Sequence, residues 1–479
     1  MTGRRTRIVC TIGPASAEAA GISALVAAGM DVARLNFSHG THAEHATVIR
    51  RLRKIEEWSG RPLAILQDLQ GPRIRLGTFG EGGGGRVDLE AGQTFTLARM
   101  PCVGTAERAA VSPPEYLSEV RVGDEVWMDD GLIQLRVETV TAADVRCRIV
   151  AGGRISDHKG ISLPSVPLPA SCLTEKDRED LRFGIAHDVD FVAVSFVRSA
   201  ADVAEVRAYL AAEGATLPLV AKLERHEALG DLPGILAAVD AVMVARGDLG
   251  MDVPLEEVPH IQKEIIRQAR VAKVPVIVAT QMLESMVTHL RPTRAEVADV
   301  TAAILDGADA VMLSAETATG RYPERAVEVM ARVAERAERA VFGDATRRRR
   351  QGRVGVGFPE AMADAAATAA HALEARAIVA FTQSGFSARL ISQARPDVPI
   401  VAFTPSPSVR RRLALSWGVS SRLIRKIETT EEMVEEIETA LLGDGSVRPG
   451  DALVIISGAP MWVTGTTNLM KLHRVGERR

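Results

Sequence analysis

The sequence predicts an α/β protein built around a closed (β/α)8 TIM barrel, with an inserted small β-barrel lid domain and a C-terminal α/β domain. Three observations indicate this. At 479 residues the chain is too long for one ordinary hydrophobic core. Short runs rich in Val, Ile and Ala recur between longer amphipathic segments, as in parallel strands that are crossed by helices. One long stretch in the first half breaks this pattern.

Eight apolar runs outside that stretch are the expected barrel strands. All but the third lead directly into a helical segment, and 199–214 and 292–307 are clear examples. Pro292 and Thr293 begin the second of these helices, and Gly307 follows its end. Eight strand-helix units suggest a closed TIM barrel. The expected strands are 7–13, 32–37, 63–69, 191–196, 217–224, 241–248, 274–280 and 310–316.

The interruption runs from about residue 72 to residue 169. Its segments alternate apolar with polar residues between Gly and Asp turns, which is typical of antiparallel β structure. Because the insertion leaves the barrel at the third strand, we expect a separate lid domain, 72–169, that overhangs the barrel mouth. Residues 1–71 and 170–345 then form the barrel.

A second α/β pattern follows a linker at roughly 343–355. The linker includes the run RRRR at 347–350, which we interpret as a solvated segment. Apolar runs then alternate again with helical segments, so 346–479 is predicted to form a third domain. These runs are 377–382, 398–403, a run near 419–427, and 451–458.

Composition and charge exclude several classes of protein. Hydrophobic residues make up 46% and charged residues 25% of the chain, the balance of a soluble globular protein. No apolar stretch reaches the roughly 18 to 20 residues of a membrane span, and the start lacks a signal peptide core, so we expect a cytoplasmic protein with no membrane partner. The net charge of −3 does not favour nucleic acid. Four widely spaced cysteines indicate reduced structural thiols without zinc or disulfides: Cys10, Cys102, Cys147 and Cys172.

Polar side chains gather at the carboxyl ends of the expected strands, where barrel enzymes place their chemistry. A single such residue could be a rim salt bridge, but seven strand ends have one. Alternate residues of a strand face the same way, so Lys222 and Glu224 can point together. The residues are Arg34, Asn36, Ser38, His39, Asp68, Ser195, Lys222, Glu224, Arg246, Asp248, Thr280, Ser314 and Glu316.

Two of these carboxylates predict a Mg²⁺ site. Glu224 and Asp248 end neighbouring strands and offer the hard oxygen ligands that Mg²⁺ needs. Gly247 lets the backbone approach an anion, and the helix that follows can direct its amides to a phosphate or carboxylate. The alternative, that Arg-Gly-Asp at 246–248 is an adhesion tripeptide, has no secretory context to support it.

Lysine usage points to the same place. Lys and Arg together number 58, of which 8 are Lys, which leaves 50 Arg. A chain that uses Arg almost everywhere retains Lys222 at a strand end, as expected if a compact ammonium is needed near a transferring phosphoryl group. Coincidence is the alternative.

Seven segments, in order along nearly the whole chain, resemble the pyruvate kinase family. The resemblance implies a barrel, an inserted lid, a C-terminal regulatory domain and usually a homotetramer. It also implies transfer of the phosphoryl group of phosphoenolpyruvate to ADP, giving ATP and an enolpyruvate that is then protonated to pyruvate. The segments are RTRIVCTIGPAS, GMDVARLNFSHGTH, LQGPRIRLG, VARGDLG, ATQMLESM, RPTRAEVADV and DGADAVMLSAETATGRYP.

The same resemblance implies roles for the strand-end residues. Glu224 and Asp248 would be the ligands of Mg²⁺ (or Mn²⁺), and Lys222 and Arg34 would contact the transferring phosphoryl group. Amides around Gly247 and Asp248 and the hydroxyl of Thr280 would hold the substrate carboxylate. The remaining implied residues are Ser195 for the substrate, His39, Arg75 and Lys159 for nucleotide phosphates, and Ser314 and Glu316 for protonation of the enolate. A second Mg²⁺ would arrive with ADP or ATP.

One segment departs from the family pattern. Potassium-dependent members have D-T-K-G-P-E where this chain has DLQGPR, with Leu69 and Arg73 in place of Thr and Glu. The Arg73 guanidinium can supply the positive charge that a monovalent cation would bring, while Asn36, Ser38 and Asp68 remain as the remnant of a cation cage. The hypothesis is that K⁺ is not required. The alternative is that Arg73 is an exposed hinge residue.

A loop in the last domain could bind a phosphorylated effector. FTQSGFSARL offers Thr382, Ser384, Gly385 and Ser387 before a helix, an arrangement that predicts a phosphate cradle. The resemblance makes an allosteric effector an expectation, with sugar phosphates or AMP as candidates. The alternative is an ordinary Ser-rich helix cap.

Two other functions stay open from the sequence. A Mg²⁺-dependent barrel lyase or aldolase would share the paired carboxylates, but it has no use for the lid or the nucleotide-facing LQGPRIR and HKG segments. A catalytically silent barrel used as a regulatory scaffold would not need Lys222, Glu224, Asp248 and Thr280 intact.

Overall fold

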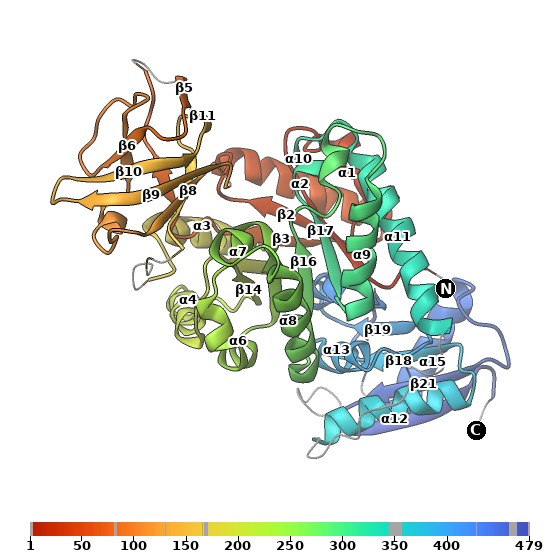
Figure 1. Ribbon diagram of the computed structural model, residues 1–479. Helices are drawn as coiled ribbons and strands as arrows, with labels where there is room; N and C mark the ends of the chain where they lie inside the picture. Colours follow the sequence, from red (N-terminus) through yellow and green to blue (C-terminus); the bar gives the residue numbers. More distant parts are fainter. Residues whose placement is uncertain are drawn as a thin grey trace.

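A computed structural model shows the chain as a barrel with one further domain at each end (Figure 1). It describes residues 3–80, 84–129, 131–164, 166, 171–343, 357–427, 429–458 and 467–477. Eight parallel strands close into a barrel in the order β1-β17-β16-β15-β14-β13-β3-β2. Each lies within one of the eight predicted runs, so the predicted TIM barrel is confirmed. The strands are β1 Arg7–Thr11, β2 Val32–Asn36, β3 Ala64–Asp68, β13 Phe191–Val194, β14 Leu219–Leu223, β15 Ala241–Ala245, β16 Val276–Ala279 and β17 Ala310–Leu313.

Helices between the strands cover the outside of the barrel (Figure 1). The two helices singled out from the sequence are α4 and α9. Thr293 caps α9 by accepting a hydrogen bond from the Glu296 amide, and Gly307 follows its end at φ 111°. The barrel helices are α1 Ala19–Ala28, α2 His42–Ser59, α3 Glu175–Ala186, α4 Ala200–Ala212, α5 Glu227–Gly230, α6 Leu232–Ala238, α7 Arg246–Asp252, α8 Val258–Ala272, α9 Arg294–Asp306, α10 Ala315–Ala318 and α11 Pro323–Gly343, with the 3-10 turn η2 Glu284–Val287.

The predicted lid is a second closed barrel, in the order β10-β6-β7-β4-β12-β8-β9. Its pairs are antiparallel as predicted, except that β6 and β7 run parallel. A small separate sheet joins β5 to β11. The lid elements are β4 Ile74–Leu76, β5 Arg86–Leu89, β6 Thr94–Ala98, β7 Arg108–Ser112, η1 Pro114–Leu117, β8 Glu125–Met128, β9 Ile133–Val140, β10 Asp144–Ala151, β11 Gly153–Ser156 and β12 Gly160–Ser162.

The C-terminal domain is a five-stranded sheet in the order β20-β19-β18-β21-β22, on the far side of the barrel from the lid (Figure 1). Three strands fall within the predicted runs, and β19 extends one residue beyond its run. The fifth, β22, was missed, because as an antiparallel edge strand it is only half-buried and lacks an apolar run. The elements are α12 Phe358–Ala372, β18 Ala377–Phe381, α13 Phe386–Gln393, β19 Ile400–Thr404, α14 Pro407–Arg412, η4 Leu413–Leu415, β20 Val419–Leu423, α15 Thr430–Gly443, β21 Ala452–Ser457 and β22 Leu469–Arg474.

The barrel interior is closed from below by the C-terminal domain. Ala414 and Leu415 of η4 belong to the same buried apolar cluster as the inward-facing side chains of the barrel strands, including Val9, Phe191 and Val220. Arg7, at the first position of β1, donates to the Ser416 carbonyl oxygen. Because a TIM barrel is a packed core and not a pore, η4 contributes to that core directly.

Some predicted features fall outside the described residues. The predicted linker continues from the end of α11 through the RRRR run, and residues 344–356 are not described. The same holds for 167–170, where the lid was predicted to end. The boundaries at 169 and 345 therefore stay predictions. Among the helices that the structure describes, none is long and apolar enough to cross a membrane.

All four cysteines lie in the described part of the chain, and none forms a disulfide. Cys10, Cys147 and Cys172 are buried, whereas Cys102 is half-buried. Burial raises the pKa of Cys147 and of Cys172 to about 12, and it raises the pKa of Cys10 well above its usual value. These three thiols therefore stay protonated and unreactive in the folded protein.

This burial predicts the thiol reactivity of the folded protein. At about pH 8 a thiol reagent should modify Cys102 rapidly and the other three only on unfolding, because the thiolate is the reactive form. The measurement is the number of thiols titrated with and without denaturant. Rapid titration of all four in the folded protein would contradict the packing described above.

Candidate active site

A buried lysine lies at the centre of the polar cluster on the carboxyl ends of the strands. Lys222 Nζ lies 2.7 Å from Glu224 Oε1 and 3.3 Å from Asp68 Oδ1. It also donates to Ser195 Oγ at 2.8 Å. Arg34 Nε donates to the other Asp68 oxygen at 2.6 Å. Four strand ends, those of β2, β3, β13 and β14, thus meet in one charged network.

The charges of this network compensate one another. Burial alone would lower the pKa of Lys222, but Asp68, Glu224 and Asp248 outweigh it, and the net effect raises that pKa. Burial alone would raise the pKa of Asp68, but Lys222 and then Arg34 outweigh it and lower that pKa. Lys222 is therefore held as a cation and Asp68 as an anion, both almost without solvent contact.

The carboxylates of Glu224 and Asp248 form a like-charge pair. Burial raises the pKa of Glu224, Lys222 opposes this, and Asp248 adds to it. Glu224 Oε2 accepts the Phe196 amide at 2.9 Å, a contact that sequence reasoning missed. Asp248 is half-buried and has no hydrogen-bond or ion-pair partner among the described residues. A divalent cation between two such carboxylates would relieve their repulsion, so the donor set fits Mg²⁺ or Mn²⁺.

Thr280 and Gly247 lie next to this pair. The Gly247 amide donates to Thr280 Oγ1 at 2.8 Å, and Thr280 and Gln281 have φ of 70° and 53°. Arg246 holds this turn, because its Nη2 donates to the Thr280 carbonyl oxygen at 2.7 Å while its Nη1 lies 2.7 Å from Asp299. Arg246 therefore positions the turn rather than facing the charged network. Two successive non-glycine residues at positive φ are typical of a functional site.

Ser314 and Glu316 follow β17 on the neighbouring strand end. The fully buried Glu316 carboxylate accepts the Leu283 amide at 3.0 Å and the Ser314 amide at 2.7 Å. Burial raises the pKa of Glu316, although these amides oppose it. Ser314 Oγ is buried and makes no hydrogen bond to the described residues. A buried hydroxyl without a partner is suited to a water molecule or a substrate atom.

Leu69 and Arg73, the two residues that depart from the family pattern, lie in different surroundings. The Leu69 side chain packs into the apolar layer between strands and helices, and only its carbonyl oxygen takes part in the site, accepting Ser195 Oγ at 2.8 Å. Arg73 is half-buried and close enough for its charge to lower the pKa of His39 and to oppose the raised pKa of Glu224. Asn36 Oδ1 accepts the Ser38 amide at 3.1 Å.

The residues expected at the nucleotide lie along the seam between barrel and lid. Burial, together with the charges of Arg75, Arg73 and Arg34, lowers the pKa of His39. Arg75 of β4 donates to the His158 carbonyl oxygen at 2.9 Å. Lys159, which precedes β12, is paired with Asp129 at 2.6 Å. His39 and Arg75 therefore share one positively charged region, and Lys159 precedes Gly160, which pairs with Arg75 in the lid sheet.

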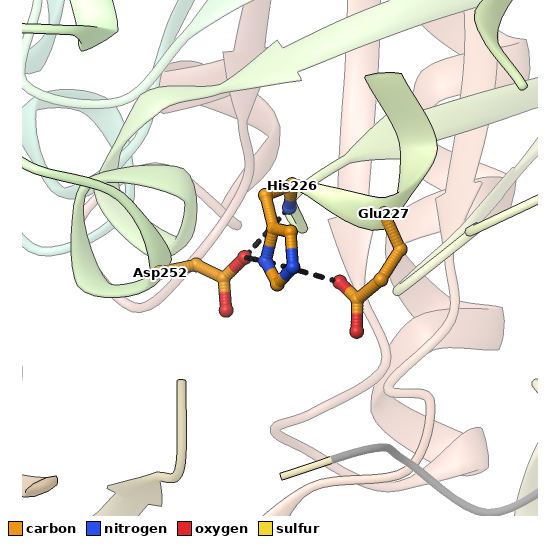
Figure 2. Close-up of side chains that lie close together, drawn as sticks. All are labelled: His226, Glu227 and Asp252. Carbon is orange, nitrogen blue, oxygen red and sulfur yellow. Dashed lines mark hydrogen bonds and ion pairs between the residues drawn. The ribbon is translucent and has the colours of Figure 1, made fainter. Parts of the chain in front are cut away.

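A cluster beside the site was not foreseen (Figure 2). His226 Nδ1 lies 2.6 Å from Asp252 Oδ2 and 3.4 Å from Glu227 Oε2, and these ligand atoms all lie within 4.8 Å of one another. The buried Arg225 contacts both carboxylates, at 2.9 Å for Glu227 and 3.1 Å for Asp252. Because Arg225 already pairs with both carboxylates, we interpret the cluster as a clamp that joins the loop after β14 to the end of α7. No local motif predicts it.

The loop proposed to bind an effector lies far from this cluster, at the start of α13. Thr382 and Ser387 are buried, and Ser387 Oγ is paired with Thr467 Oγ1 at 2.7 Å. Ser384 is exposed, and Gly385 precedes the helix at φ 82°. No side chain of the loop caps the helix, so the ordinary serine cap has no support among these residues.

The chain is similar to known proteins over almost its whole length. The family model described as "Pyruvate kinase, barrel domain" matches residues 3–327, and "Pyruvate kinase, alpha/beta domain" matches 360–473. The pyruvate kinase of Corynebacterium efficiens is 46% identical over 99% of this chain and 98% of its own. That of Mycobacterium tuberculosis is 44% identical over 99% of each. A solved pyruvate kinase from Cryptosporidium parvum superposes with a TM-score of 0.89 at 34% identity, covering 98% of this chain and 96% of its own.

The central ammonium generates a prediction about stability. Lys222→Met should lower the free energy of unfolding by about 3–5 kcal/mol, because it leaves Asp68 and Glu224 buried without their cation. Lys263→Met is the control, since Lys263 is exposed and its pair with Asp306 should be worth about 0–1 kcal/mol. Both are measured by denaturant unfolding. Equal losses in the two variants would show that the network does not depend on Lys222.

Proposed function

The chain belongs to the pyruvate kinase family, and from that premise we propose how its own residues transfer the phosphoryl group of phosphoenolpyruvate to ADP. The observation that supports the proposal most strongly is the buried Lys222 beside the like-charge pair Glu224 and Asp248. Positively charged groups around a loose transition state, held in position, are the general requirement of phosphoryl transfer.

Glu224 and Asp248 would hold the divalent cation, Mg²⁺ or Mn²⁺, which when bound supplies positive charge to the substrate oxygens. Lys222 and Arg34 then contact the phosphoryl group from the protein side. Ser195 orients Lys222 through the 2.8 Å hydrogen bond, and Asp68 holds both cations in place. This arrangement is fixed before substrate arrives, which lowers the reorganisation that the reaction requires.

The substrate carboxylate would lie at the beginning of α7. The amides of Gly247 and Asp248 and the hydroxyl of Thr280 are its expected donors, and a bound carboxylate would take over the hydrogen bond that Gly247 now makes to Thr280. Any Cβ at position 247 would lie 3.5 Å from Thr280 Oγ1, in the space that the carboxylate would use.

His39, Arg75 and Lys159 would bind the nucleotide phosphates, and a second Mg²⁺ would arrive with ADP. Lys159 would first have to leave Asp129, its partner within the lid, so nucleotide binding would rearrange this side chain. Ser314 and Glu316 would belong to the polar network that protonates the enolate. The unpartnered Ser314 hydroxyl supports this role, since it is free to bond a water molecule at that position.

Two alternative functions have less support. A barrel lyase or aldolase would not need the lid, yet family similarity extends over almost the entire chain, lid included. A silent scaffold would have no reason to keep a buried lysine among three carboxylates, an arrangement that costs stability unless every charge is paired.

We further propose that this enzyme does not require K⁺. Arg73 is half-buried and acts electrostatically on Glu224 and His39, which argues against the exposed hinge residue considered as its alternative. Asp68, the one carboxylate of the potential cation cage, is already occupied by Arg34 and Lys222. A guanidinium in this region replaces the charge of a monovalent cation.

Pyruvate release from phosphoenolpyruvate and ADP with Mg²⁺, in a buffer whose only monovalent cation is Na⁺, tests both proposals. Prompt turnover that added K⁺ leaves unchanged is expected. Arg73→Glu should introduce a K⁺ requirement, with Arg86→Glu, an exposed arginine of the lid, as the control. Turnover only after K⁺ would refute the role of Arg73 but keep the kinase, and no turnover in either buffer would count against the kinase itself.

We also propose how the enzyme is regulated, how it assembles and where it is located. Family membership favours a homotetramer in the cytoplasm. It also favours activation by a phosphorylated metabolite such as a sugar phosphate or AMP. The loop with Thr382, Ser384, Gly385 and Ser387 is the proposed phosphate cradle, and its support is that its helix start is left without a side-chain cap.

The cradle is tested by activation assays. Ser384→Glu and Ser387→Ala should each weaken activation by the effector at least about fivefold, because they add a negative charge and remove a donor. Ser420→Glu, an exposed position on β20, should respond like wild type. An effector that activates wild type and Ser384→Glu equally would exclude this loop.

A further inference from the structure

A cavity of about 170 Å³ lies between the bottom of the barrel and the C-terminal domain. Its barrel side is formed by α4 and by residues at the amino-terminal ends of β13 to β16, among them Phe191 and Asp240. Its other side is formed by α13, α14 and η4. The cavity is thus at the opposite end of the barrel from Lys222 and separate from the active site.

The charged groups that face this cavity are three arginines and one aspartate, namely Arg207, Arg389, Arg412 and Asp240. Asp240 is already engaged, because its Oδ2 accepts the Leu219 amide and Arg207 Nη2, each at 2.9 Å. Asp240 therefore pairs with Arg207. The positive charges of Arg389 on α13 and Arg412 on α14 are left in excess.

Neither of the two remaining arginines forms an ion pair with a carboxylate of the described residues. Arg389 donates to the Ser384 carbonyl oxygen at 3.2 Å. Burial lowers the pKa of Arg389; Asp240 opposes this effect, and the charge of Arg412 adds to it. The Arg412 side chain makes no hydrogen bond or ion pair with any described residue, and its Nε is buried. Buried donors without a partner are costly, and an anion in the cavity would satisfy both guanidinium groups.

We propose that this cavity binds a small phosphate-bearing metabolite. Guanidinium groups match phosphate with two parallel hydrogen bonds, and the cavity adds the hydroxyl-bearing residues Thr216, Ser384 and Ser416. Phosphate offers more acceptor oxygens than a carboxylate and so uses more of these donors. The volume is below the roughly 300–1,000 Å³ usual for drug-sized ligands, which favours a ligand of about three carbons over a nucleotide.

The cavity has a direct connection to the barrel core. Leu415 lines it and, with Phe191, also belongs to the inward-facing cluster of the barrel. A ligand that draws α13 and α14 toward α4 would change how Leu415 packs against β13 and β14, the strands that lead to Ser195 and Lys222. Occupancy should therefore change the KM for phosphoenolpyruvate more than kcat. The site is distinct from the proposed cradle, with which it shares only Ser384.

The probes are sn-glycerol 3-phosphate and inorganic phosphate, titrated calorimetrically into the full chain without divalent metal, so that the active site contributes little. Wild type should bind at least one of them. Arg412→Gln and Arg389→Gln should weaken binding about tenfold or more, because each removes a charge-assisted pair. Arg425→Gln removes an exposed arginine paired with Glu436, and Ser387→Ala alters only the cradle, so both should bind like wild type.

Turnover of the variants with Mg²⁺, phosphoenolpyruvate and ADP shows that they are folded, since neither arginine touches the active site. Binding that persists in both arginine variants would place the anion elsewhere and overturn the proposal, as would the absence of binding of either probe to wild type. Loss of binding in Ser387→Ala but not in Arg412→Gln would assign the anion to the cradle instead.

Discussion

The organisation of the site depends on one buried ammonium group. Lys222 lies almost without solvent contact among Asp68, Glu224 and Asp248, and a charge in that position is tolerable only if its partners are held at fixed distances. Those partners come from the ends of separate strands, so the closed barrel is what fixes the distances. Arg34 completes the balance on Asp68. Fold and charge network therefore depend on each other: the barrel brings the groups together, and their mutual neutralisation makes a polar barrel end compatible with a stable core.

Much of the fold could be predicted because buried parallel strands have a simple signature. A strand covered on both faces by apolar neighbours reads as an apolar run, and all eight barrel strands and four strands of the last domain were found in this way. The period of two along a strand also indicated that Lys222 and Glu224 share a face, and they lie 2.7 Å apart. The edge strand β22 was missed because half of its side chains face solvent and its pattern resembles that of a loop.

Features that depend on partners distant in the sequence could not be predicted. Arg246 was grouped with the site because it ends a strand, but its partner Asp299 lies on α9, and no local pattern links the two. The clamp formed by His226, Glu227 and Asp252 has the same character, since Asp252 comes from the end of another helix. Leu69 is the opposite case, because a local motif suggested a role that its side chain does not have. Its position in the motif suggested the site, yet an apolar side chain is more stable in the layer between strands and helices, and only its carbonyl oxygen reaches the site.

The contact of η4 with the barrel interior determines when the barrel can complete its folding during synthesis. Ala414 and Leu415 complete an apolar cluster whose other members lie between Val9 and Met312, so the catalytic barrel does not contain all of its own core. During synthesis from the amino terminus, the lower end of the barrel stays unfinished until the chain has been extended past residue 415 of 479. The catalytic and C-terminal parts of the chain therefore reach their final packing together, and a nascent chain that stopped after α11 would expose apolar side chains at the base of its barrel.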